Sequence, residues 1–299
     1  MCSLAVTSPS TCGKIKIPIS ASRIVLPTTT RPSIKNAKSS QAPNAKSASS
    51  NGSHNSLPVI SSSIAHLNQA VIACTLCARL VAYREEIGRV KRRAYLDWEY
   101  WAKPVPGFGD PDASILILGL APGAHGSNRT GRPFTGDGSG DFMYPVLHET
   151  GFASQPRATS RDDGMNLTDA YITAAVRCAP PANKPAPEEI ANCAHFLDAE
   201  IALLQKLKVV VALGKIGFDA YLNHLRRIGV IASRAPYEFR HGAEFRMPNG
   251  IVLLGTYHPS LQNTNTGKLT AEMFRRIFER ARKLIDHGGT ETRRNTGTG

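Results

Sequence analysis

The sequence predicts an α/β protein in which helices cover both faces of a small, mainly parallel sheet of four strands. Four short apolar runs lack polar alternation, as expected for strands buried on both faces. Helical patterns separate these runs, and a segment rich in Gly, Pro, Asn or His follows each one. The 299 residues are 41% apolar, enough for an ordinary core, and no run reaches the ~18 apolar residues of a membrane span.

Each predicted element follows from a local pattern. The apolar runs predict strands at 114–118, 170–176, 209–213 and 251–256. Apolar residues at three- and four-residue steps predict the helices between and after them. The best defined begins with Pro-Glu-Glu, residues suited to a first turn. The predicted helices are 141–149, 187–207, 216–226 and 270–285.

Composition divides the chain into three parts. Residues 1–56 are rich in Ser, Thr, Pro, Ala and Asn without a periodic pattern, which predicts a disordered arm. The first 60 residues hold seven Lys or Arg and no acid, so +6 of the +13 net charge belongs to the remainder. We expect one domain at 57–286 and a disordered tail at 287–299. The arm is also compatible with an organelle transit peptide.

The four loops after the strands predict the functional site. Ligands of an open parallel sheet bind outside the carboxyl ends of its strands. The first loop, GLAPGAHGSNRTGRPFTGD, contains five glycines, and such loops bring backbone N–H groups close to a ligand. RCAPPANKPAPEE, GKIG and YHPSLQNTNTG follow the other strands. We therefore expect these loops to meet at one edge of the sheet.

Four of the six cysteines suggest a metal centre. Cys74 and Cys77 form a CxxC pair, and Cys178 and Cys193 supply two further thiols. Four sulfurs suffice for zinc or for a [4Fe–4S] cluster. The wide spacing of the second pair favours the cluster, and zinc remains the alternative.

These motifs resemble the uracil-DNA glycosylase superfamily, specifically its iron–sulfur family 5 (type b) branch. The resemblance covers residues 73–285 and includes the first loop, VRCAPPANKP, HPSLQN and the four cysteines. It implies a three-layer α/β/α sandwich and a monofunctional hydrolase that removes uracil from DNA and leaves an abasic site. Two departures from other branches imply looser base selection: GLAPG lacks an acid or amide beside its proline, and Thr173-Ala174-Ala175 lacks a base-reading asparagine. Hypoxanthine and xanthine are therefore further expected substrates.

The resemblance assigns chemistry to particular residues. A base must leave the duplex before its sugar bond can be attacked. Phe134 is expected to stack on that base, beside backbone donors of the glycine loop. His258 is placed to hydrogen-bond the departing base, and Asp137 or Asn183 to handle water or the cationic sugar. Asp137 is alternatively a helix N-cap, and Asn183 a turn residue. The loop residues expected around the base are Gly119, Leu120, Ala121 and Gly123.

The expected partner is double-stranded, and possibly single-stranded, DNA. Either Leu261 or Gln262 would fill the gap left by the extruded nucleotide, with Asn263 beside them. The expected phosphate contacts are Arg129, Arg132 and Lys184, together with the basic run Lys91, Arg92 and Arg93.

Other function classes fit less well. The zinc deaminase, P-loop and serine hydrolase motifs are absent. A catalytically silent DNA-binding protein with the same fold is the main alternative. We expect a monomer in the cytoplasm, associated with the nucleoid, without membrane contact.

Overall fold

The computed structural model describes residues 63–287, which form one compact unit. The predicted arm at 1–56, its transit-peptide alternative and the tail from residue 288 lie outside the described residues. No helix within 63–287 has both the length and the apolar character needed to cross a membrane.

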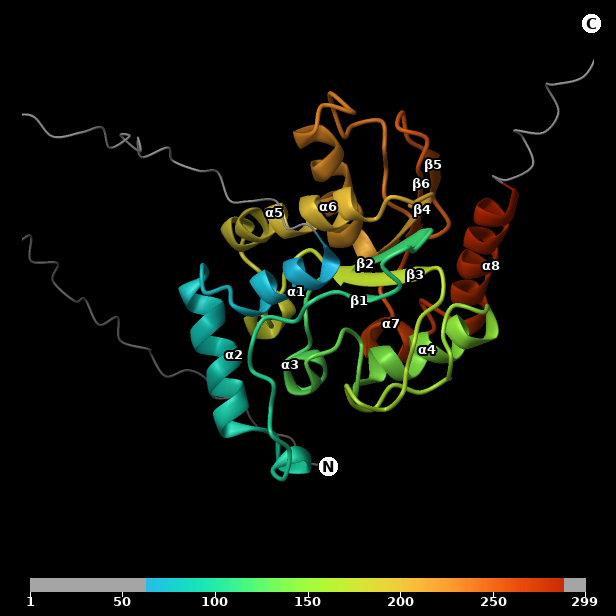
Figure 1. Ribbon diagram of the computed structural model, residues 1–299. Helices are drawn as coiled ribbons and strands as arrows, with labels where there is room; N and C mark the ends of the chain where they lie inside the picture. Colours follow the sequence, from blue (N-terminus) through green and yellow to red (C-terminus); the bar gives the residue numbers. More distant parts are fainter. Residues whose placement is uncertain (1–62, 288–299) are drawn as a thin grey trace, which may run out of the picture. The chain divides into compact units, whose positions relative to one another are not determined.

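A mixed sheet of six strands forms the centre of the described domain (Figure 1). The strand order is β1-β3-β2-β4-β6-β5. The four inner strands are parallel: β2 (Ile115–Gly119), β3 (Ala170–Ala174), β4 (Val209–Leu213) and β6 (Val252–Thr256). The edge strands β1 (Phe108–Gly109) and β5 (Glu244–Arg246) pair antiparallel with β3 and β6. The prediction of an α/β fold is confirmed, and the sheet has two more strands than expected.

Successive residues of the inner strands enter two different cores, which makes three layers. Ile115 and Ile117 pack with α4 (Gly138–Glu149) and α8 (Ala271–His287) on one face. Leu116 and Leu118 pack on the other face with α5 (Pro187–Leu203) and α6 (Gly214–Arg227). Burial on both faces explains why the strands show no polar alternation.

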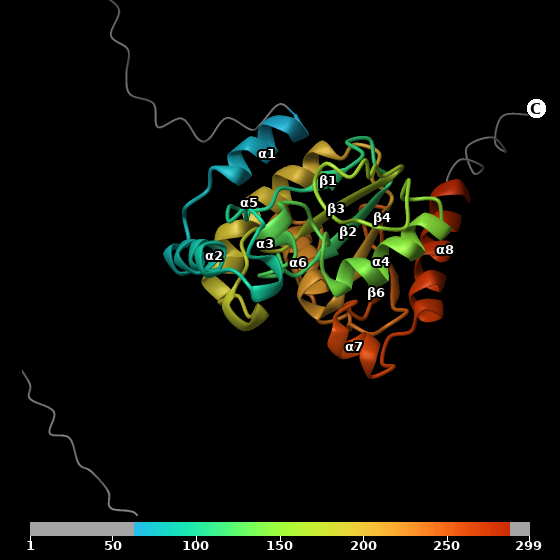
Figure 2. The same cartoon turned by 90° about the horizontal axis from the view of Figure 1, so that it is seen from below.

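The remaining helices lie beside this sandwich. The helices α1 (Ile64–Ile72) and α2 (Ala78–Val90) precede the sheet, and α1 packs on α5. Four short helices occur in the loops: η1 (Arg93–Tyr95), α3 (Ser127–Thr130), η2 (Pro181–Asn183) and α7 (Leu261–Asn265). In both ribbon views, α3 lies between α2 and α7 (Figures 1 and 2).

Candidate active site

A pocket of about 840 Å³ lies at the carboxyl ends of the inner strands. The glycine loop after β2, the β3–α5 loop and the β6–α7 loop all contribute to its wall. The structure thus brings together most of the predicted site residues. Those lining the pocket are Gly119, Leu120, Ala121, Gly123, Phe134, Asp137, Asn183, Lys184, His258, Leu261 and Gln262.

Phe134 and His258 face each other within this pocket. Their ring centroids are 5.9 Å apart and their planes are inclined by 35°. Phe134 has a φ of 51°, in the left-handed region, and its N–H donates to the Ser127 hydroxyl at 3.0 Å. A β-carbon at Gly119 would lie 3.0 Å from Cζ of Phe134, so glycine leaves room for the ring. Such a backbone conformation costs about 1–3 kcal/mol and occurs preferentially at functional sites.

His258 is a neutral imidazole at neutral pH. Burial lowers the pKa of His258 to about 4. The side-chain amide of Asn263 donates to the backbone carbonyl of His258 at 2.9 Å, which fixes the β6–α7 loop. A neutral ring with one N–H can donate a hydrogen bond to an oxygen that gains negative charge.

Asp137 has two roles in the structure. Its Oδ1 accepts the backbone N–H groups of Ser139 and Gly140, at 3.1 and 3.0 Å, and so caps α4. Its Oδ2 lies against Gly126, where any β-carbon would overlap the carboxylate. Burial raises the pKa of Asp137 above its ordinary value, although the two cap hydrogen bonds oppose that shift. The carboxylate therefore caps the helix and also lines the pocket.

Asn183 reaches the pocket from η2. It is exposed and, like its neighbour Ala182, has a positive φ, 55° and 52° respectively. Its N–H donates to the Pro180 carbonyl, so it is also a turn residue, as the alternative prediction had it.

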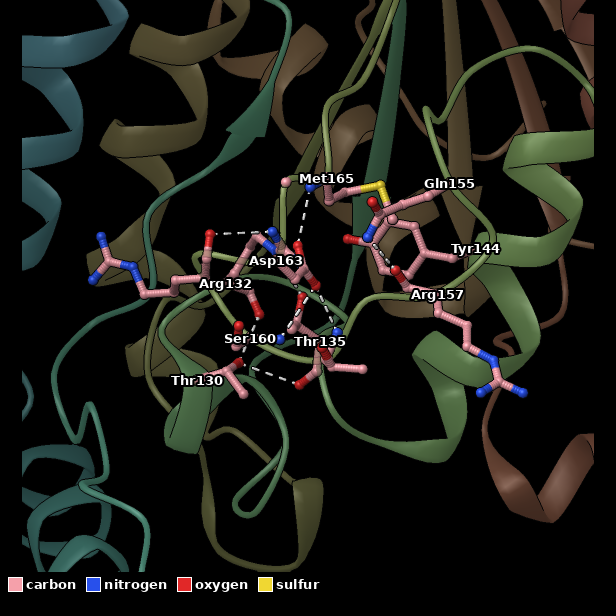
Figure 3. Close-up of polar contacts among 12 residues, drawn as sticks. Thr130, Arg132, Thr135, Tyr144, Gln155, Arg157, Ser160, Asp163 and Met165 are labelled. Atoms are coloured by element: carbon pink, nitrogen blue, oxygen red, sulfur yellow. Dashed lines mark hydrogen bonds and ion pairs between the residues drawn. The ribbon is translucent and has the colours of Figure 1, made fainter.

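The predicted phosphate contact of Arg132 is wrong, because its side chain is only 4% exposed. Its guanidinium donates to the Thr135 hydroxyl at 2.9 Å and to Asp163 at 2.7 Å (Figure 3). Burial would raise the pKa of Asp163, yet the hydrogen bond from Arg132 and three backbone N–H groups hold it well below its usual range. Arg132 therefore stabilises the glycine loop through buried contacts.

Arg129 requires the same correction, since it is 3% exposed. It donates to the carbonyls of His125 and Gly136, at 2.8 and 2.7 Å. The rings of Tyr95 and Trp98 lie 3.9 and 4.0 Å from its guanidinium carbon. Both guanidinium groups are buried and donate to groups within the protein.

The other predicted DNA contacts are distributed as follows. Lys184, Leu261 and Gln262 are exposed on the pocket rim, and Leu261 packs against Gly138 at the start of α4. The side-chain amide of Asn263 instead points to the His258 carbonyl, and Asn263 does not line the pocket.

The four predicted metal ligands gather beside the pocket. Cys178 and Cys193 are buried in one apolar cluster, Cys77 packs against it, and Cys74 packs against the adjoining cluster. All four are free thiols. Burial raises the pKa of Cys178 to about 11 and also raises that of Cys193, and neighbouring thiols add to both shifts. Within residues 63–287, no group of three or more His, Cys, Asp or Glu side chains is arranged to hold a single metal ion.

Arg84 connects the thiols to the pocket. This arginine of α2 is 4% exposed, and its Nη1 donates to Sγ of Cys178 at 3.0 Å. Its carbonyl accepts the side-chain amide of Asn128, in α3 of the glycine loop, at 3.2 Å. The donor set of four thiols with an adjacent cation suits a thiolate-bound group.

Sequence reasoning missed several pocket residues. Tyr83, Tyr95, His125 and Arg177 line the wall together with the predicted ones. His125 lies inside the glycine loop and could have been found there, and its Nδ1 lies 3.1 Å from the Tyr100 hydroxyl. Tyr83 lies in α2, where the sequence predicted no element, and Arg177 begins the loop after β3, so no sequence signal singled them out.

Comparisons with known proteins identify the family of this chain. The profile of the Uracil DNA glycosylase superfamily matches residues 106–282. The chain is 55% identical to a Type-5 uracil-DNA glycosylase of Thermus thermophilus over 72% of this chain and 95% of that protein. The identity is 48% to a protein of the same name from Mycobacterium bovis, over 74% and 82%. A third, from Pyrobaculum aerophilum, is 41% identical over 71% and 88%.

Proposed function

The chain belongs to the uracil DNA glycosylase superfamily, and we propose that it hydrolyses the N-glycosidic bond of uracil in DNA, leaving an abasic site. The observation that carries this proposal is the juxtaposition of Phe134 and His258, with ring centroids 5.9 Å apart, in a pocket that Asp137 also lines. An aromatic platform, a neutral hydrogen-bond donor and a carboxylate are the groups that excision of a base requires.

The first step is extrusion of the nucleotide from the duplex. It costs a few kcal/mol, least for a mispaired base such as uracil opposite guanine. The extruded base stacks on Phe134, a contact worth about 1–3 kcal/mol. Leu261 or Gln262 fills the gap, since both are exposed on the rim.

Bond cleavage then separates two charges. The departing base gains negative charge on its oxygen, and the N–H of His258 stabilises it without giving up a proton. The sugar gains positive charge, which the Asp137 carboxylate stabilises, and the attacking water forms the new bond to C1′ as Asp137 accepts its proton. Asn183 is a second polar group at the same wall and is our candidate for positioning that water.

We extend the substrate range to hypoxanthine and xanthine. Ala174 lines the pocket at the end of β3 and offers no amide to select one base. Excision assays on duplexes carrying each lesion measure the range, and strict preference for uracil would contradict it.

We also propose that Cys74, Cys77, Cys178 and Cys193 hold a [4Fe–4S] cluster, supported by their gathering and by Arg84 beside Cys178. These four thiols would hold the cluster and so link the segment before α2, the β3–α5 loop and α5, and hydrolysis would require no redox step from it. Purified protein should be brown, absorb near ~400 nm and contain iron and sulfide. Stoichiometric zinc in a colourless protein would establish the alternative.

The direct test uses the purified protein and a labelled duplex with one uracil. Incubation followed by alkaline treatment should cut the strand at the uracil, and an otherwise identical thymine duplex should stay intact. Retarded migration of the uracil duplex without cleavage would instead support the catalytically silent DNA-binding protein.

A further inference from the structure

The segment between α2 and β1 forms a surface that the proposed chemistry does not use. Residues 89–103 contain five Lys or Arg and two Asp or Glu. Arg92 and Arg93 are exposed, and Arg92 also lines the pocket. Because Arg92 lines the pocket, this surface places positive charge at the pocket edge.

Internal carboxylates do not neutralise these two arginines. Among residues 63–287, none of the ion pairs includes Arg92 or Arg93, whereas nearby Arg89 pairs with Glu86 at 2.7 Å. The acids of the same stretch, Asp97 and Glu99, are exposed and also form no ion pair within the described part. The charge of Arg92 reaches the pocket wall, because after burial it is the next cause that lowers the pKa of His125.

The surface is held rigidly in place. The guanidinium of Arg129 lies between the rings of Tyr95 and Trp98, at 3.9 and 4.0 Å. The backbone carbonyls of Asn128 and Arg129 accept the N–H groups of Ala102 and Trp101, at 3.0 and 2.9 Å. Cation–π contacts of this kind are strongest where the cation is desolvated, as it is here. Arg129 therefore joins the outer segment to the glycine loop.

Arg92 and Arg93 belong to the basic run that the sequence predicted to contact phosphates. We propose that they bind the DNA strand whose nucleotide enters the pocket, and that Tyr95, Arg129 and Trp98 hold them in place for it. This inference rests on the proposed function, because it takes DNA as the ligand. It also gives Arg129 a role different from the predicted one: Arg129 holds the phosphate-binding surface and does not touch phosphate. Exposed guanidinium groups with free donors suit phosphate oxygens.

The test measures binding separately from cleavage. The ligand is a fluorescent duplex without uracil, and its affinity for the full-length protein is measured by anisotropy at several salt concentrations. The test protein carries Arg92→Ala and Arg93→Ala. The matched control carries Arg226→Ala and Arg246→Ala, which remove two exposed charges. Arg226 lies at the end of α6, and Arg246 lies in β5, paired with the first residue of β6. Neither lines the pocket.

Each phosphate contact contributes about 0.9 to the slope of log affinity against log salt concentration. We expect the slope of the test protein to fall by about two and its low-salt affinity to fall about tenfold or more. The control should keep the wild-type slope. Equal slopes in the test and control proteins would overturn the proposal.

Excision assays separate the two proposals. In single-turnover excision of uracil DNA, the test protein should need about tenfold or more enzyme to reach half of its own maximal rate, because binding is the step that loses two contacts. If the wild type cuts no uracil DNA but the two substitutions still lower the salt-dependence slope, the phosphate-binding surface is supported and the proposed glycosylase activity is refuted. If the wild type cuts uracil DNA but the slope of the test protein is unchanged, the glycosylase activity is supported and the phosphate-binding surface is refuted.

Discussion

Two sets of buried charged or ionisable groups differ in how they are partnered. Glu200 and Arg177, beneath β3, form an ion pair, and Thr173 hydrogen-bonds to both. By contrast, no opposite charge pairs with His258 or Asp137 within the described part of the chain. Burial shifts the pKa of each toward the uncharged form.

The difference separates scaffold from chemistry. A buried charge that already has an opposite charge as its partner holds one arrangement of the scaffold, and loss of that partner is costly. An unpaired buried charge costs stability and remains available for a charge that appears during reaction. We therefore expect changes in the first set to alter folding, and changes in the second to alter rate.

The largest effect should come from Glu200→Gln. The substitution leaves the fully buried Arg177 guanidinium without a counter-charge, which costs about 3–5 kcal/mol of unfolding free energy. Urea unfolding followed by circular dichroism measures the loss. Glu279→Gln on α8, where the acid is exposed and pairs with Arg275, should change stability by less than about 1 kcal/mol. Similar losses in the two variants would show that the buried pair is not special.

Asp137→Asn should reduce single-turnover excision about a thousandfold, within the range of catalytic proton-handling groups. Asn is as good an N-cap as Asp, so α4 keeps its cap while the pocket loses its charge. DNA affinity should stay within about threefold, because the substitution leaves the binding surface intact. A variant with normal excision would reduce Asp137 to a helix cap.

The pH profile gives a second measure of Asp137. Because burial raises the pKa of Asp137, excision should fall as the pH drops through a midpoint above the usual ~4 of an aspartate. His258 contributes nothing to this limb above its own pKa of about 4. The residual activity of Asp137→Asn should lack the limb.

His258→Ala should slow excision about a hundredfold, at the low end for loss of one oxyanion donor. His241→Ala is the matched control, since His241 lies 3.2 Å from the Thr256 hydroxyl and outside the pocket. The control should excise normally. Equal losses in the two variants would assign the effect to the β6 region as a whole.

Phe134→Ala should cost about 1–3 kcal/mol, the value of one base–aromatic stack. Relief of the positive φ does not offset this loss, because Ala shares the penalty there. The loss should appear in the affinity for DNA that contains uracil. It is measured as the enzyme concentration that gives half of the maximal single-turnover rate. An unchanged half-maximal concentration would place the base elsewhere.

The sequence predicted the inner strands because strands buried on two faces are continuous apolar runs, which can be recognised without knowledge of tertiary contacts. The pocket loops were predicted because they directly follow these runs. The edge strands β1 and β5 escaped prediction, since they have two and three residues and no buried face. Their pairing depends on neighbours that are distant in the chain.

The sequence placed Phe134, Asp137 and His258 at one pocket, but it did not foresee the burial of Arg129 and Arg132. Arg129 and Arg132 looked like phosphate contacts because a guanidinium in a polar loop is usually exposed. Their actual partners, Trp98 and Asp163, are 31 residues away in sequence, on either side of the loop. Burial of an arginine is thus a tertiary property that the loop alone could not reveal.

The smallest expected effect is a gain in stability from Asp137→Asn. The folded pKa of Asp137 is raised, so its ionised form costs unfolding free energy at neutral pH. That cost is absent below the unfolded-state pKa and present above the folded one. The Asn variant, which retains the cap, should therefore unfold at higher urea concentration than wild type at pH 7, and the difference should fade as the pH falls below about 4. A variant that is less stable at pH 7 would mean that the cap hydrogen bonds of the carboxylate outweigh its desolvation. Asp137 would then be a stabilising group, and the distinction between groups that stabilise the fold and groups that serve the reaction would not hold for it.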